Sequence, residues 1–217
     1  MSFYQVLDFL RDLNKNNHKA WMDEHRDRYH EVRDFMLDWI GELDQRLQKE
    51  DANYRPTPAK KAISRINNNK VFKPDSPTYR DYFGAELNQG DGRPIFYVSV
   101  GLSWSFIGGG FHRPNNDRLT SIRAAIDYDG DELKKIISKK SFADTFSELT
   151  KGDSLKTAPK GYANDHRHID LLRLKSFAVM HNITQKDIVA DDFTEKVVSI
   201  YREIIPFNRY LEKAVSI

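Results

Sequence analysis

The sequence of 217 residues contains no cysteine, so the protein can form no disulfide, no thiolate metal site and no cysteine nucleophile. Long hydrophobic runs are also missing, because no apolar stretch approaches the roughly 20 residues that a membrane-spanning helix needs. The first ten residues lack both the basic segment and the apolar core of a secretion signal. These absences predict a soluble, cytoplasmic protein.

An excess of charge of either sign is missing as well. The 34 Lys and Arg residues nearly balance the 32 Asp and Glu residues, which leaves a formal net charge of +2. This balance gives no global attraction to nucleic acid or to anionic membranes, so any anion site must be local. At this length, and with 39% hydrophobic residues, the chain can bury a core without disulfides, and we expect one domain over residues 1–217.

Hydrophobic periodicity predicts an α+β fold, with N-terminal helices, a central and mostly antiparallel sheet, a helical middle section and C-terminal helices. Apolar residues recur at helical spacing over residues 3–13 and again over residues 18–49, which predicts a short helix followed by a long one. We expect the sheet between about Ala62 and Gly110, as a meander. Its strands are expected at residues 62–66, 82–87 and 95–100.

The second half of the chain combines several helix signals with one extended segment. Asn115 is a predicted N-cap, and residues 128–130 are predicted to separate its helix from the next one. We expect an extended segment near Leu155 and a helix leading into a strand over residues 171–179. The other predicted helical features are capping boxes at Ser141 and Thr184, and two C-terminal helices, 193–205 and 207–215, divided by Pro206.

The most distinctive stretch, residues 95–114, reads I-F-Y-V-S-V-G-L-S-W-S-F-I-G-G-G-F-H-R-P. Three consecutive glycines, Gly108, Gly109 and Gly110, could expose backbone N–H groups in a loop that binds an anion. The alternative is that they bend a strand or let another backbone pass close by. No P-loop and no dinucleotide-binding fingerprint accompanies them, so the phosphate signal is weak.

Basic side chains concentrate in the predicted loops beside the sheet. Lys70 and Lys73 lie in a polar, proline-containing loop between Arg65 and Arg80. Arginine forks and lysine charges suit carboxylates and phosphates, although a solvated basic face is the simpler interpretation. The basic residues expected to face an anion-binding pocket are Arg65, Lys70, Arg80, Arg113 and Lys160.

Four potential metal ligands follow in the segment 163–173, namely Asp165, His166, His168 and Asp170. We expect no metal there, because two histidines separated by one residue, without a clear third partner, are a weak metal pattern. His166 is instead expected to be oriented by Asp165 or by loop backbone. These two residues are the weak catalytic candidates. The sequence does not identify a cofactor and leaves open whether the protein is an enzyme.

Several motifs in combination resemble a bacterial and fungal family known only as a domain of unknown function. They are R-I-N-N-N-K-V-F at 65–72, P-T-Y-R at 77–80, F-I-G-G-G-F-H-R-P at 106–114 and P-K-G-Y-A-N-D-H at 159–166. The resemblance implies one full-length domain without an assigned activity, cofactor or partner. Where the family reads R-I-x-R-D-x-R-F, this chain has Asn68, Asn69 and Val71 at the Arg, Asp and Arg positions.

Two functional hypotheses follow from these patterns. The first is a pocket that binds or processes a small anionic ligand bearing a phosphate or a carboxylate. The second is a non-catalytic interaction module that binds protein or a nucleic-acid backbone through exposed rings, although rings packed in the core are the simpler interpretation. Its surface would consist of Tyr79, Tyr82, Phe83, Trp104 and Phe111. A membrane partner is not expected, the near-neutral charge disfavours nucleic acid, and the oligomeric state stays open.

Overall fold

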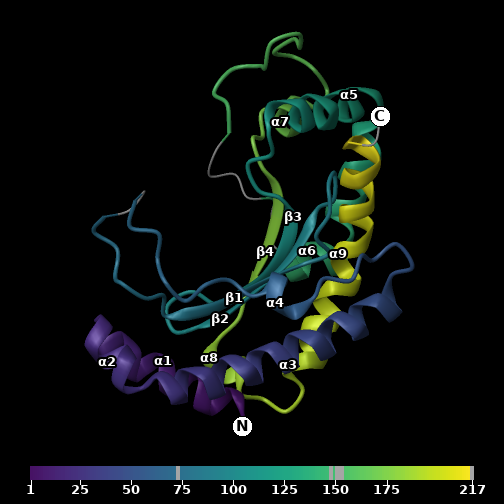
Figure 1. The fold of residues 1–217 in the computed structure, drawn as a ribbon. Helices are drawn as coiled ribbons and strands as arrows, with labels where there is room; N and C mark the ends of the chain where they lie inside the picture. The colour runs from purple at the N-terminus through teal and green to yellow at the C-terminus, as the bar shows by residue number, and fades with distance from the viewer. Residues whose placement is uncertain (72–73, 147–148, 150–153, 216–217) are drawn as a thin grey trace. The chain divides into compact units, whose positions relative to one another are not determined.

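The computed structural model describes residues 1–71, 74–146, 149 and 154–215, and its helices and four-stranded antiparallel sheet confirm the α+β class (Figure 1). Lys73 lies outside the described residues. The strands are β1 (Tyr82–Leu87), β2 (Ile95–Gly101), β3 (Phe106–Phe111) and β4 (Phe177–Asn182), in the order β1-β2-β3-β4. The helices are α1 (Phe3–Lys15), α2 (Lys19–Glu24), α3 (Arg26–Glu50), α4 (Ala59–Ala62), α5 (Asn116–Ser138), α6 (Lys140–Phe146), α7 (Ile169–Leu172), α8 (Gln185–Ile188) and α9 (Phe193–Val215). Within the described part of the chain, no helix combines the length and apolarity needed to cross a membrane.

The chain groups into two compact units, each assembled from three separate pieces. The first unit comprises Met1–Leu87, Tyr97–Ile107 and Asn182–Val198. The second unit comprises Asn88–Phe96, Gly108–His181 and Ser199–Ile217. The single domain expected from the sequence stays a prediction.

The core of the first unit forms around the aromatic end of α1. The ring of Phe3 meets the rings of Trp39 and Phe193 edge-on, with centroids 5.1 and 5.0 Å away. Trp39 stacks on Phe193 and donates from Nε1 to the Thr194 hydroxyl at 3.0 Å, which satisfies its one polar atom. Val6, Leu7, Leu10 and Leu13 of the predicted stripe on α1 are buried, and Phe9 is buried with them.

The single long helix predicted over residues 18–49 is wrong, because the helix breaks at His25. This residue ends α2 and begins α3 with backbone angles (φ −110°, ψ 24°) outside the helical range. Its ring stacks on Trp21 with centroids 4.1 Å apart, and its Nδ1 donates to the Trp21 carbonyl at 2.9 Å. Local side-chain bonding therefore stabilises a break that hydrophobic periodicity does not register.

Two of the three strands predicted in the meander are present as β1 and β2. The third, at residues 62–66, is wrong, because the N–H groups of Lys61 and Ala62 donate to the Pro58 carbonyl and close the turn of α4. Only an isolated bridge between Ile63 and Ala85 remains of that expected strand. The sheet gains β4 from a part of the chain that lies beyond the predicted sheet region.

In the second unit, α5 begins as predicted, with the Asn115 side chain accepting the Arg118 N–H at 3.0 Å. The separation of two helices predicted at residues 128–130 is present as a kink, because Asp129 has non-helical angles (φ −144°, ψ 58°) between the two helical segments of α5. A capping box at Ser141 is wrong, since the Lys139 carbonyl already accepts the Ala143 N–H and α6 begins at Lys140.

Two further expectations for the second half of the chain are wrong. The extended segment near Leu155 amounts to one bridge between Ser154 and Leu174. The division of the last helix at Pro206 is wrong, because α9 runs unbroken through it. Ile204 and Phe207 are fully buried on either side of Pro206. Their packing outweighs the missing proline N–H.

Candidate functional site

The predicted site residues divide between the two units. Arg65, Lys70 and Arg80 belong to the first unit. The second unit holds Gly108, Gly109, Gly110, Arg113, Lys160, Asp165 and His166. The expectation that all of them line one recess therefore stays a prediction.

The three glycines lie in strand β3 and not in a loop, which corrects the expectation of a glycine loop. A Cβ on Gly108 would stand 2.3 Å from the Val179 carbonyl oxygen, and Gly110 has a positive φ of 110°. Because β3 is hydrogen-bonded to a strand on each side, the N–H groups of these glycines face neighbouring strands. Their observed role is to allow close approach of backbone, the alternative that the sequence left open.

In the first unit, Arg80 is the predicted basic residue whose surroundings best suit an anion. Its backbone N–H donates to the Ile66 carbonyl at 2.7 Å, which fixes its place directly before β1. The guanidinium carbon lies 5.6 Å from the centroid of the Tyr82 ring. Its Nε is buried and has no hydrogen-bond partner among the described residues. An unpaired buried donor costs about 1–3 kcal/mol, which an incoming acceptor would offset.

Two hydroxyl groups lie close together beside this strand. The Tyr97 hydroxyl lies 2.0 Å and the Ser64 hydroxyl 3.1 Å from the point where a Cβ on Gly84 would stand. Ser64 Oγ accepts the Gly84 N–H at 3.2 Å, which leaves its own proton free to donate. The Tyr97 hydroxyl has no hydrogen bond within the part of the chain that the structure describes. Glycine at position 84 thus makes room for both groups.

Tyr97 is a hydrogen-bond donor at neutral pH. Burial raises the pKa of its hydroxyl to about 12, with smaller contributions from Tyr82 and Glu86, while Arg80 acts in the opposite direction. Arg80 thus acts on this hydroxyl through its charge, and the hydroxyls of Tyr97 and Ser64 both lie beside Gly84. The guanidinium of Arg80 and the hydroxyls of Ser64 and Tyr97 therefore make a small cluster of donors, which we call the Arg80 cluster.

Between residues 65 and 80, the described part of the loop is locally folded and mostly exposed. Arg65 and Lys70 are exposed and form no ion pair with any residue in the described ranges. Asn68 donates from its side chain to the Pro77 carbonyl at 2.9 Å, and the Asn69 side chain accepts the Val71 N–H at 3.1 Å. The asparagines that stand where the resembled family has charges are thus used for turns.

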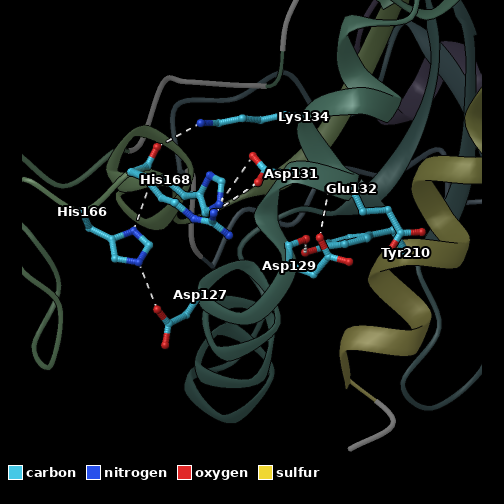
Figure 2. Close-up of polar contacts among 9 residues, drawn as sticks. Asp127, Asp129, Asp131, Glu132, Lys134, His166, His168 and Tyr210 are labelled. Atoms are coloured by element: carbon cyan, nitrogen blue, oxygen red, sulfur yellow. Dashed lines mark hydrogen bonds and ion pairs between the residues drawn. The ribbon is translucent and has the colours of Figure 1, made fainter.

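In the second unit, the carboxylate that pairs with His166 is Asp127 on α5 and not Asp165, whereas the expected alternative, a bond to loop backbone, is present (Figure 2). His166 Nδ1 accepts the His168 N–H at 3.1 Å, so the proton is on Nε2, which donates to Asp127 Oδ1 at 3.0 Å. Both ring nitrogens of His166 are therefore occupied within the chain. As described, His166 has no free nitrogen with which to act as a base.

His168 is a buried histidine that the sequence did not single out for its burial. Its side chain is fully buried, and neither ring nitrogen has a hydrogen-bond partner among the described residues. The ring covers Gly130, where a Cβ would stand 2.6 Å from it, and Nε2 lies 3.8 Å from Asp131 Oδ1 (Figure 2). Burial lowers the pKa of His168 below its ordinary value, and the charge of Lys134 adds to this effect.

A groove of about 380 Å³ lies in the same unit, lined by residues of α5 and α9. Its lining includes Ala124, Tyr128, Tyr210 and Ala214, and none of the predicted site residues. Burial, then the negative charges of Asp129 and Glu132, raise the pKa of Tyr210 to about 12 (Figure 2).

The remaining predicted residues of the second unit lie at the surface. Arg113 and Lys160 are exposed, and the Arg113 N–H donates to Ser176 Oγ at 3.0 Å. The described residues contain no group of three or more His, Asp or Glu that could hold a metal ion.

The prediction that an interaction module exposes five aromatic rings is wrong for three of them. Tyr79, Phe83 and Phe111 are only 6%, 2% and 6% exposed, because they pack in the core. Trp104 is 54% exposed, and Tyr82 is partly exposed.

Sequence reasoning missed Ser64 and Tyr97. A signal for Tyr97 was available, since it alternates with the buried residues Phe96 and Val98 and must occupy the opposite face of β2. Nothing in the sequence indicated that Gly84 would make room for it.

The family model of a conserved hypothetical protein, DUF2461, matches residues 5–210, and the chain therefore belongs to this family. No curated protein and no solved structure matches the chain. The match covers nearly the whole sequence, as expected of a full-length domain.

Proposed function

We propose that this member of the DUF2461 family binds a small anionic ligand, bearing a phosphate or a carboxylate, at the Arg80 cluster. The observation that carries the proposal is the buried Nε of Arg80, which has no partner among the described residues. Charge-assisted bonds from guanidinium to such oxyanions are the strongest that this donor can make. The family match supports neither this ligand nor another, and the support comes from the Arg80 cluster alone.

The groups around Arg80 suit an acceptor-only ligand. Tyr97 is protonated because its pKa is raised to about 12, and Ser64 retains a free proton, so both can donate to the same anion. The cation of Arg80 supplies the charge, and Tyr82 beneath it limits where the guanidinium can move. Arg65, directly after Ser64, is exposed and adds positive charge nearby.

Isothermal titration calorimetry with inorganic phosphate, at low and constant ionic strength, tests the proposal. Arg80→Ala should weaken phosphate binding at least tenfold, because a hydrogen bond to a charged group contributes about 1.5–3 kcal/mol. Tyr97→Phe keeps the ring and removes the hydroxyl, and should weaken binding by a smaller factor.

Arg33→Ala is the matched control, because it removes the same charge from α3, where the one ion pair of Arg33 among the described residues is a 4.0 Å contact with Asp34. Equal losses in Arg80→Ala and Arg33→Ala would indicate general electrostatics and contradict the proposal. So would wild-type protein that binds neither phosphate nor a small carboxylate such as citrate.

A further inference from the structure

A row of aromatic rings continues from the Arg80 cluster. Tyr97 on β2 stacks on Phe106 of β3, with centroids 5.3 Å apart and planes inclined by 19°. Phe106 in turn contacts Trp104, with centroids 4.7 Å apart and planes inclined by 36°. The three rings therefore form one row that begins at the hydroxyl of Tyr97 and ends at Trp104.

The far end of this row is open to solvent. Trp104 is 54% exposed, whereas Trp39 of the same unit is 6% exposed. The Trp104 carbonyl accepts the Ser99 hydroxyl at 3.0 Å, so its backbone is held while its indole remains available. An exposed indole on a fixed backbone is the kind of surface on which a planar ring stacks.

Tyr97 belongs to both features, because its hydroxyl lies in the Arg80 cluster and its ring lies in the row. Arg80 lies just before β1 and Trp104 lies in the turn between β2 and β3, and these three strands are neighbours in the sheet. Two strand spacings amount to roughly 10 Å, which a nucleoside monophosphate can span between its phosphate and its base.

We propose that the ligand is a nucleoside monophosphate, with its phosphate at the Arg80 cluster and its base on Trp104. This inference rests on the proposed function for the phosphate and adds a stacking site for the base. Stacking on an aromatic side chain tolerates any base, so we expect little preference among the four bases. The site takes a single nucleotide, because the cluster offers one arginine with an unpaired buried nitrogen within the described part of the first unit.

The test compares three probes on the full chain, namely AMP, inorganic phosphate and adenosine, by calorimetry under identical buffer conditions. AMP should bind at least fivefold more tightly than phosphate, which corresponds to the lower bound for stacking one base. Arg80→Ala should weaken both AMP and phosphate. Trp104→Leu should weaken AMP at least fivefold and leave phosphate unchanged, whereas Trp104→Phe, which keeps a ring, should retain most of the AMP affinity.

Trp104 is exposed, so its variants should fold, and matching thermal denaturation curves for wild type and both variants establish this. If phosphate binds but AMP binds no more tightly, the nucleotide inference is overturned and the proposed function stands. If AMP binds tightly and Trp104→Leu has no effect, the placement of the base is overturned. If none of the three probes binds, both proposals are overturned. Affinity that rises steeply with oligonucleotide length would identify a polymer as the ligand and overturn the mononucleotide.

Discussion

Alanine in place of Gly108 should destabilise the protein severely, because the strand β3 has no room for a methyl group there. A Cβ at this position would stand 2.3 Å from the Val179 carbonyl oxygen and 3.3 Å from the Met180 Cα. Both are backbone atoms of β4, which cannot rotate away as a flexible side chain could. Either β4 moves as a strand or the contact is relieved by distortion of β3.

The expected loss of stability in Gly108→Ala follows from these two ways of relieving the contact. Overpacking a filled site costs about 1–3 kcal/mol. Displacing β4 would also weaken one or two ladder hydrogen bonds, each contributing about 0.5–1.5 kcal/mol. We therefore expect Gly108→Ala to lower the free energy of unfolding by roughly 2–4 kcal/mol. That is a large part of the roughly 5–15 kcal/mol that a folded domain has in total.

Urea denaturation followed by far-ultraviolet circular dichroism measures this loss as a lower midpoint at unchanged slope. Gly41→Ala in α3 is the matched control, since a Cβ at Gly41 would meet nothing within 4 Å. In a helix interior this change should raise stability by up to about 1 kcal/mol. Replacing glycine by alanine should thus lower the stability at position 108 and raise it at position 41.

A loss below about 1 kcal/mol in Gly108→Ala would refute the reasoning, because overpacking alone should cost that much. If the variant were fully stable yet lost affinity for phosphate, the glycines would serve a ligand and not the sheet. The original anion-binding interpretation of Gly108–Gly110 would then be restored.

Two further predictions concern buried and capping groups. Because the pKa of His168 is lowered in the folded protein from its ordinary value of 6.5, its neutral form contributes stability that is complete above pH 6.5 and is lost as the pH falls below it. His168→Leu should therefore flatten the dependence of the urea midpoint on pH between about 5 and 7, and an unchanged slope would contradict this. Thr184→Ala removes the hydroxyl that accepts the Asp187 N–H at 3.2 Å and should cost about 1 kcal/mol in the same assay. Thr184→Ser should restore most of that stability, and a Ser variant no better than Ala would count against a capping role.

Local patterns in the sequence were sufficient for several elements. The strand β1 has the predicted bounds, because alternation and flanking turns act within a few residues. The caps at Asn115 and Thr184 are present because a cap is a bond between a side chain and a backbone N–H three residues away. The α+β class follows from the same short-range information.

Long-range contacts decided the remainder. Asp127, the partner of His166, lies 39 residues earlier in the chain, so no spacing rule could identify it. The continuity of α9 through Pro206 depends on burial of its neighbours, which overrides the local proline signal.

The sequence by itself determined which residue types are available: arginines and glycines in distinctive motifs, and no cysteine. Only the tertiary structure decided their use. It placed Gly108 against the backbone of β4 and left Arg80 with an unpaired buried nitrogen among the described residues. The physical reason is that backbone proximity and side-chain pairing depend on which strands become neighbours, and periodicity along the chain does not specify this.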